Sequence, residues 1–152
     1  MINIVVDLRG SFGPARDQNP RPTCLAFAAS DAHAAARPSW EPLSPEWAYY
    51  HALKRDGGRP DEGATLGAML ATIKSDGQPV EDEWPYIKAP ITDIKSWEPP
   101  KPARQLFFRD HATCTVTVQN IIDQLNVGCP VLITMTLSDA FFRPSAPPGF
   151  TP

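Results

Sequence analysis

The sequence has few cysteines, no long hydrophobic run and no large excess of charge of either sign. No apolar run reaches the about 18 residues that would cross a membrane, so we expect no membrane partner. The 14 basic and 17 acidic side chains give a net charge of −3 over 152 residues. That balance is too weak to predict a nucleic acid partner. The N-terminal segment MINIVVDLRG also lacks the basic start and long apolar stretch of a secretory signal.

Cysteine and histidine are both scarce. The three cysteines are Cys24, Cys114 and Cys129, and an odd, low number without a signal predicts reduced thiols and a cytoplasmic location. Neither these cysteines nor the three histidines show the C-x-x-C or H-x-x-x-H spacing of metal ligands. We therefore expect no metal site and no cofactor.

The sequence is rich in proline, with 18 residues, which predicts short helices joined by stiff loops. Thr23 and Ser44 are candidate N-caps for helices over 23–36 and 44–56, and a third helix is expected within 63–79. In that third helix an apolar stripe at helical spacing is interpreted as core. Its residues are Leu66, Met69, Leu70 and Ile73.

The second part of the chain has a different pattern. Residues 103–118 are rich in strand-forming residues, 119–128 predict a short helix, and 129–137 read as a buried strand. A further short strand is expected at 3–6. Helices followed by strands predict an α+β fold, in a chain long enough for one ordinary core.

Cys24 stands where a loop rich in Gln, Asn and Pro becomes an alanine-rich helix. One interpretation is a small, buried structural residue, which is the usual place of a cysteine in a helix. The other is a nucleophile, because the N–H groups and dipole at a helix N-terminus favour the thiolate and lower the pKa. Gln18 lies six residues upstream and could supply one donor to an oxyanion, with the Cys24 N–H as the second.

The segment VDLRGSFGPARDQNPRPTCLAFA resembles the start of the mature papain-like cysteine peptidases, and four later segments resemble that family in the same order. These segments are LSPEWAYY, the glycine-containing segment and helix that begin EGATLGAML, the stretch GQPVEDEWPY that follows this helix, and GCPVLITMTLSDAFF. The resemblance implies a peptidase acting on peptide or protein substrates. Two departures stand out: Arg21 replaces a cysteine of the family's usual disulfide, and Leu25 replaces its usual tryptophan.

The resemblance also assigns residues and domains. Cys24 matches the catalytic nucleophile and Gln18 the oxyanion donor. Four positions match the substrate-binding rim, namely Gly63, Thr65, Leu66 and Thr134. The implied fold has a helical left domain, here 1–102, and an antiparallel β right domain, of which 103–152 would be an incomplete part. An unclosed barrel predicts self-association through its exposed edges.

The general base is missing from this pattern. Papain-like catalysis needs a histidine about 130–150 residues after the cysteine, which here falls beyond Pro152. His33 lies nine residues along the same helix, about 13 Å from Cys24 by helical rise. We expect His51 to be solvated or capping, and His111 to lie on a structural strand.

Three functions therefore remain open at the level of sequence. The first is a cysteine peptidase whose histidine lies beyond this chain, so that the chain alone is inactive. The second is a catalytically inactive remnant that binds peptides or proteins. The third keeps the cysteine nucleophile but performs another acyl transfer, such as transamidation.

Overall fold

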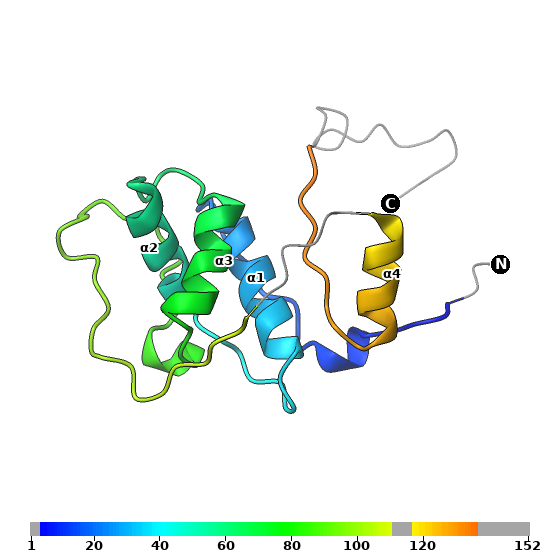
Figure 1. The fold of residues 1–152 in the computed structure, drawn as a ribbon. Helices are drawn as coiled ribbons and strands as arrows, with labels where there is room; N and C mark the ends of the chain where they lie inside the picture. The colour runs from blue at the N-terminus through cyan, green and yellow to red at the C-terminus, as the bar shows by residue number, and fades with distance from the viewer. Residues whose placement is uncertain (1–3, 111–116, 137–152) are drawn as a thin grey trace, which may run out of the picture.

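The computed structural model describes residues 4–110 and 117–136 of the chain (Figure 1). Three helices pack against one another, α1 (Cys24–Ala35), α2 (Pro45–Asp56) and α3 (Leu66–Ser75). A fourth, α4 (Val118–Asn126), lies to one side of them in Figure 1. Two short 3-10 turns, η1 (Arg9–Ser11) and η2 (Glu81–Glu83), interrupt the connecting loops.

The predicted helix over 44–56 is confirmed as α2, and α3 lies inside the predicted range 63–79; the bounds of both follow from their caps. The Ser44 hydroxyl accepts a hydrogen bond from the Trp47 N–H at 3.0 Å, and Pro45 occupies the first turn. Gly57 ends α2 in the left-handed region, at φ 66°. The Thr65 hydroxyl caps α3 by accepting from the Ala68 N–H. The sequence pattern thus determined both helices locally.

The core lies between α1, α2 and α3. Alanines at Ala26 and Ala29 let α1 approach its neighbours closely, and Met69 and Ile73 fill the space from α3. Trp47, Trp84 and Trp97 close this core on the side of the 84–98 segment. Of the predicted stripe on α3, Met69 and Ile73 are buried, whereas Leu66 remains 38% exposed. Burial of this apolar surface is the main source of stability for the three-helix unit.

In Figure 1, α1 and α3 run in the same direction, and α2 runs opposite to both. The first residues of α1 and α3 therefore lie at the same end of the bundle. The loop 57–65, which carries Gly63, crosses that end between α2 and α3. This arrangement brings the segments of the predicted nucleophile and substrate rim to one end of the helical unit.

The predicted β structure is not seen. Within residues 4–110 and 117–136 there is no strand, and backbone pairing is limited to two isolated bridges, Leu43 with Val80 and Gln78 with Phe107. The prediction of a buried strand at 129–137 is wrong for 129–136, where Ile133 and Met135 are exposed. The pattern of side chains alone does not make a strand, because each strand needs a neighbour for its backbone hydrogen bonds.

Two other strand predictions are wrong for the described residues. Residues 4–6 form no strand, and residues 103–110 contribute only the bridge at Phe107. His111 and Cys114 lie outside the described residues. The helical part of the predicted α+β fold is confirmed, and the division into domains at 102/103 stays a prediction.

In the part of the chain that the structure describes, no helix is long and apolar enough to span a membrane.

Candidate active site

Cys24 is the first residue of α1, and its side chain is exposed. The first hydrogen bond of the helix runs from the Phe27 N–H to the Thr23 carbonyl, at 3.1 Å. The N–H groups of residues 24–26 precede this bond and have no carbonyl of the helix to receive them. Thr23 occupies the N-cap position but makes no side-chain cap. The sulfur therefore stands on a helix end whose amides and dipole favour negative charge.

Gln18 lies in the loop that leads into α1. Its side-chain amide donates to the Arg21 carbonyl at 3.1 Å, so the side chain folds back over its own turn. Asn19 takes the left-handed conformation at φ 54°, and the Asp17 carboxylate accepts from its N–H at 2.7 Å. Asparagine tolerates this conformation better than most residues, which explains the tight turn there. One N–H of the Gln18 amide is used by Arg21, which leaves the second for a ligand.

Arg16 fixes the start of this loop to the helical unit. Its guanidinium contacts the Asp31 carboxylate of α1 at 2.5 Å and the Glu81 carboxylate of η2 at 2.8 Å. It also lies 5.0 Å from the centre of the Phe27 ring. These contacts attach the start of the Gln18 loop to α1 and to η2.

Arg21 is buried, and it forms the other end of the loop's attachment. Its guanidinium donates to both carboxylate oxygens of Glu46 in α2, at 2.6 and 2.9 Å. The side chains are only 1% and 0% exposed. Glu46 also accepts from the Ile87 N–H and from the Trp97 indole N–H, at 3.1 and 2.7 Å. The carboxylate is therefore fully satisfied without solvent, as a buried charge requires.

Tyr86 connects the Gln18 loop to the start of α1. Its hydroxyl lies 2.5 Å from the Gln18 carbonyl oxygen and 2.8 Å from the Thr23 hydroxyl. A carbonyl can only accept, so Tyr86 donates to Gln18, and Thr23 then donates to Tyr86. This chain of hydrogen bonds draws the Thr23 hydroxyl to Tyr86 instead of to the amides of α1.

The four predicted rim residues have different surroundings. Gly63 is exposed, and a Cβ added there would meet nothing within 4 Å. Thr65 is engaged structurally, since its hydroxyl bonds Asp56 at 2.9 Å in addition to capping α3. Leu66 is partly open to solvent, and Thr134 is exposed on the segment after α4. The 57–65 loop and the start of α3 thus lie at the same end of the three helices as the start of α1 (Figure 1).

The two described histidines are engaged away from Cys24. His33 is buried, and its Nδ1 lies 2.8 Å from the Gln78 side-chain oxygen. Burial lowers the pKa of His33, against the opposing effect of the Gln78 hydrogen bond. His51 was expected to be solvated or capping, but it is half-buried against the Trp47 ring, at 4.7 Å between ring centres. Burial lowers its pKa too, and the Asp76 carboxylate 3.9 Å away opposes that effect.

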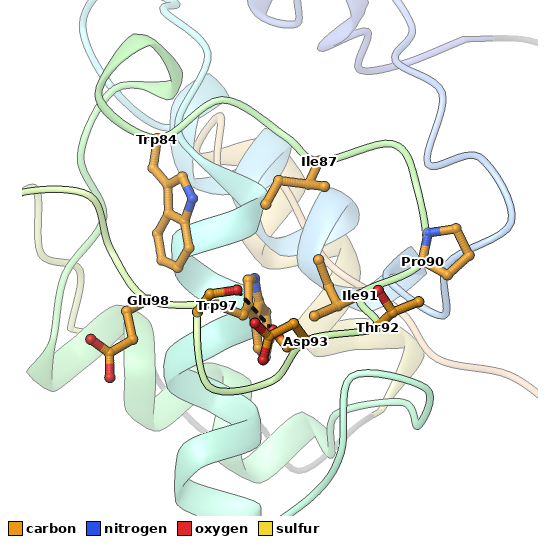
Figure 2. Close-up of a pocket in the computed structure, with 9 residues that line it drawn as sticks. Trp84, Ile87, Pro90, Ile91, Thr92, Asp93, Trp97 and Glu98 are labelled. Atoms are coloured by element: carbon orange, nitrogen blue, oxygen red, sulfur yellow. Dashed lines mark hydrogen bonds between the residues drawn. The ribbon is translucent and has the colours of Figure 1, made fainter.

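A shallow pocket of about 240 Å³ lies along the 84–98 segment, and it contains none of the predicted site residues. Figure 2 shows Trp84, Ile87 and Ile91 pointing into this pocket, with Asp93 at its edge. The Asp93 carboxylate is tied to its own turn by the Lys95 N–H, and its hydrogen bond with Ser96 is the main cause that lowers its pKa. The pocket therefore belongs to the aromatic cover over Glu46.

Among residues 4–110 and 117–136, no group of three or more His, Cys, Asp or Glu side chains could hold a metal ion. The chemical groups on the start of α1 and on the loop before it are the Cys24 thiol, the N–H groups of residues 24–26 and the Gln18 carboxamide.

Comparison with solved structures finds a match to the crystal structure of xylellain, a cysteine protease from Xylella fastidiosa. The sequence identity is 27% and the TM-score is 0.48. The match covers 64% of this chain and 38% of the xylellain chain, so the chain spans well under half of that protein's length. No family model and no curated protein matches the sequence.

Sequence reasoning missed Glu46 and Tyr86, the two side chains that hold the loop before Cys24. Arg21 was noticed only as the replacement of a cysteine. Its contact with Glu46 joins residues 25 apart, and that of Tyr86 with Gln18 joins residues 68 apart. No local spacing signals such pairs.

Proposed function

We propose that Cys24 is the nucleophile of a papain-like cysteine peptidase site, with Gln18 and the Cys24 N–H as oxyanion donors. The observation that carries the proposal is the position of Cys24, exposed at the uncapped start of a helix that is otherwise largely buried. Peptide-bond hydrolysis by this route begins with attack of the sulfur on the scissile carbonyl. The charge that develops on the carbonyl oxygen is then stabilised by fixed N–H donors.

The proposed substrate is an extended peptide that lies across the open end of the bundle, with Gly63, Thr65, Leu66 and Thr134 as its binding positions. Gly63 suits backbone pairing with such a peptide, because no side chain stands in the way. Leu66 offers a partly exposed apolar surface for a side chain of the substrate.

The reaction also needs a general base, and both described histidines have other partners. Removal of a general base typically costs about two to four orders of magnitude in rate. We therefore expect the 152-residue chain by itself to hydrolyse peptides very slowly, and added imidazole to increase that rate in the wild type but not in Cys24→Ser.

The test of the nucleophile is alkylation by iodoacetamide at pH 6, followed by peptide mass spectrometry. We expect Cys24 in the folded chain to react more than about tenfold faster than Cys114 and than Cys24 in the urea-unfolded chain, because the thiolate is the reactive form. Cys129 serves as a second internal reference. Equal rates in the folded and unfolded chain would contradict the proposal.

A second candidate function is a peptide- or protein-binding module without catalysis. The engagement of His33 with Gln78 and of His51 with Trp47 favours it, because neither side chain is free to serve Cys24. This function predicts peptide binding that survives Cys24→Ser, measured by fluorescence anisotropy, together with a Cys24 thiol of ordinary reactivity.

A further inference from the structure

We infer that Tyr86 is a positioning residue for the oxyanion donors. Its hydroxyl would tie the Gln18 segment to the first residue before Cys24. This inference rests on the proposed function, and it adds a residue from a distant segment to the site. Tyr86 would act through Gln18 and Thr23, without touching the substrate itself.

The hydrogen bonds define the direction of this link. Thr23 donates to the Tyr86 oxygen at 2.8 Å, and Tyr86 donates to the Gln18 carbonyl at 2.5 Å. Both partners flank the two proposed donors: Gln18 carries one of them, and Thr23 immediately precedes the Cys24 N–H. One hydroxyl therefore sets the separation between the two sides of the oxyanion site.

The Tyr86 ring is itself held firmly. It packs edge-on against Phe27 of α1, with 4.7 Å between ring centres, and the Arg21 guanidinium lies 5.0 Å from its centre. Arg21 in turn donates to the carbonyl of Ile87, the next residue along the chain. These contacts fix the position of the Tyr86 ring and therefore of its hydroxyl, as a positioning residue requires.

Arg16 and Arg21 hold the two ends of this loop through ion pairs, and between them Tyr86 attaches the Gln18 backbone. Among the described residues, the Gln18 side-chain amide bonds to the Arg21 carbonyl within the same loop. The link from Tyr86 is the hydrogen bond that attaches the Gln18 backbone to a different part of the fold. Loss of the hydroxyl should let the Gln18 carboxamide move relative to the Cys24 N–H. Small displacements of this kind reduce rates strongly when a reaction depends on orientation.

The experiment compares two reactions of Cys24 in the whole chain. In the first, p-nitrophenyl acetate acylates the thiol. The sulfur–carbon bond forms, the ester carbon–oxygen bond breaks, p-nitrophenolate leaves with the electron pair, and the thiol proton passes to the buffer. This reaction passes through an oxyanion. In the second, iodoacetamide alkylates the thiol by displacement of iodide, and no oxyanion forms.

For Tyr86→Phe we expect acylation to slow about tenfold relative to the wild type, with the alkylation rate unchanged. Thr23→Val should behave in the same way, whereas Thr23→Ser, which keeps the hydroxyl, should retain the wild-type ratio. Gln18→Ala should also slow acylation. The double variant Tyr86→Phe/Gln18→Ala should lose no more than Gln18→Ala alone, because residues that act as one unit are not additive.

Tyr50→Phe is the matched control, since its ring packs between Trp84 and Trp97, away from the Gln18 loop. It should leave both rates unchanged. Equal slowing of acylation and alkylation in Tyr86→Phe would overturn the inference, as would additive losses in the double variant. Wild-type rates in Tyr86→Phe, while Gln18→Ala is slow, would overturn it and leave the proposed function standing. A wild type that is acylated no faster than its unfolded chain would overturn both.

Discussion

Replacement of Arg21 by methionine removes the cation from the buried Arg21–Glu46 pair while keeping most of the side-chain volume. Glu46 then remains at 0% exposure, with the Ile87 N–H and the Trp97 indole as its donors. Those two neutral donors satisfy part of the carboxylate but do not balance its charge. Breaking a buried ion pair by removing one partner typically costs about 3–5 kcal/mol of unfolding free energy. We expect a loss in that range for Arg21→Met.

A loss of this size is large, because domains are stable by only about 5–15 kcal/mol. For a chain of this length it corresponds to a fall in Tm of about 6–20 °C. The assay is thermal and urea unfolding followed by circular dichroism at pH 7. Arg9→Met is the matched control: Arg9 also pairs with a carboxylate, that of Asp7, but the two side chains are 82% and 41% exposed. It should leave the Tm unchanged, since exposed pairs contribute little.

The ion pair can also be tested by substitution of Glu46. Glu46→Gln keeps an oxygen for the Trp97 indole but removes the charge that Arg21 needs. The double variant Arg21→Met/Glu46→Gln leaves no unpaired charge, so its loss should be smaller than the sum of the two single losses by about 1–3 kcal/mol. A cost below about 1 kcal/mol for Arg21→Met, or strict additivity in the double variant, would refute the account of this pair as a buried, mutually dependent unit.

Two further predictions concern backbone strain and pH. In urea unfolding, Gly77→Ala should destabilise the fold by more than Gly57→Ala. Both glycines have φ near 66°, so both substitutions strain the backbone. A Cβ at Gly77 would also lie 2.9 Å from the Phe107 carbonyl oxygen, whereas one at Gly57 would meet nothing within 4 Å. Equal losses would show that the contact with Phe107 is unimportant. The lowered pKa values of His33 and His51 predict that stability is complete above pH about 6.5 and declines below it, because the unfolded chain takes up protons first. A Tm that stays constant from pH 7.5 to 5 would contradict this. The double variant His33→Gln/His51→Gln should lose less Tm than the wild type over the same pH range.

The three packed helices could be predicted because their signals are local. Ser44, Thr65 and Gly57 each act within one turn of the helix that they begin or end. The alanine-rich composition after Thr23 likewise predicted the helix over 23–36. Thr23 shows the limit of such reasoning, since its place was right but its hydroxyl bonds Tyr86, 63 residues away.

The strands could not be predicted on the same basis. Residues 129–136 have the composition of a buried strand, yet the structure gives them no strand partner among the described residues. Val118, Ile122 and Val127 of the α4 region are exposed as well. Strand formation depends on what lies alongside, which a single segment does not encode. The predicted self-association through this region stays a prediction.

The Arg21–Glu46 pair also determines how the loop before Cys24 is attached to α2. The family that the sequence resembles has a cysteine of its usual disulfide at the position of Arg21, and here a bidentate ion pair joins that position to α2 instead. The two devices act differently. A disulfide stabilises mainly by restricting the unfolded chain, whereas a buried ion pair exists only in the folded state and leaves the unfolded chain unrestricted. The loop should therefore keep its stability in the presence of a reductant, at the cost of depending on complete packing around Glu46. Trp97 and Ile87 supply that packing together with two of the four donated hydrogen bonds, so the cover formed by the 84–98 segment is part of the support for the candidate active site.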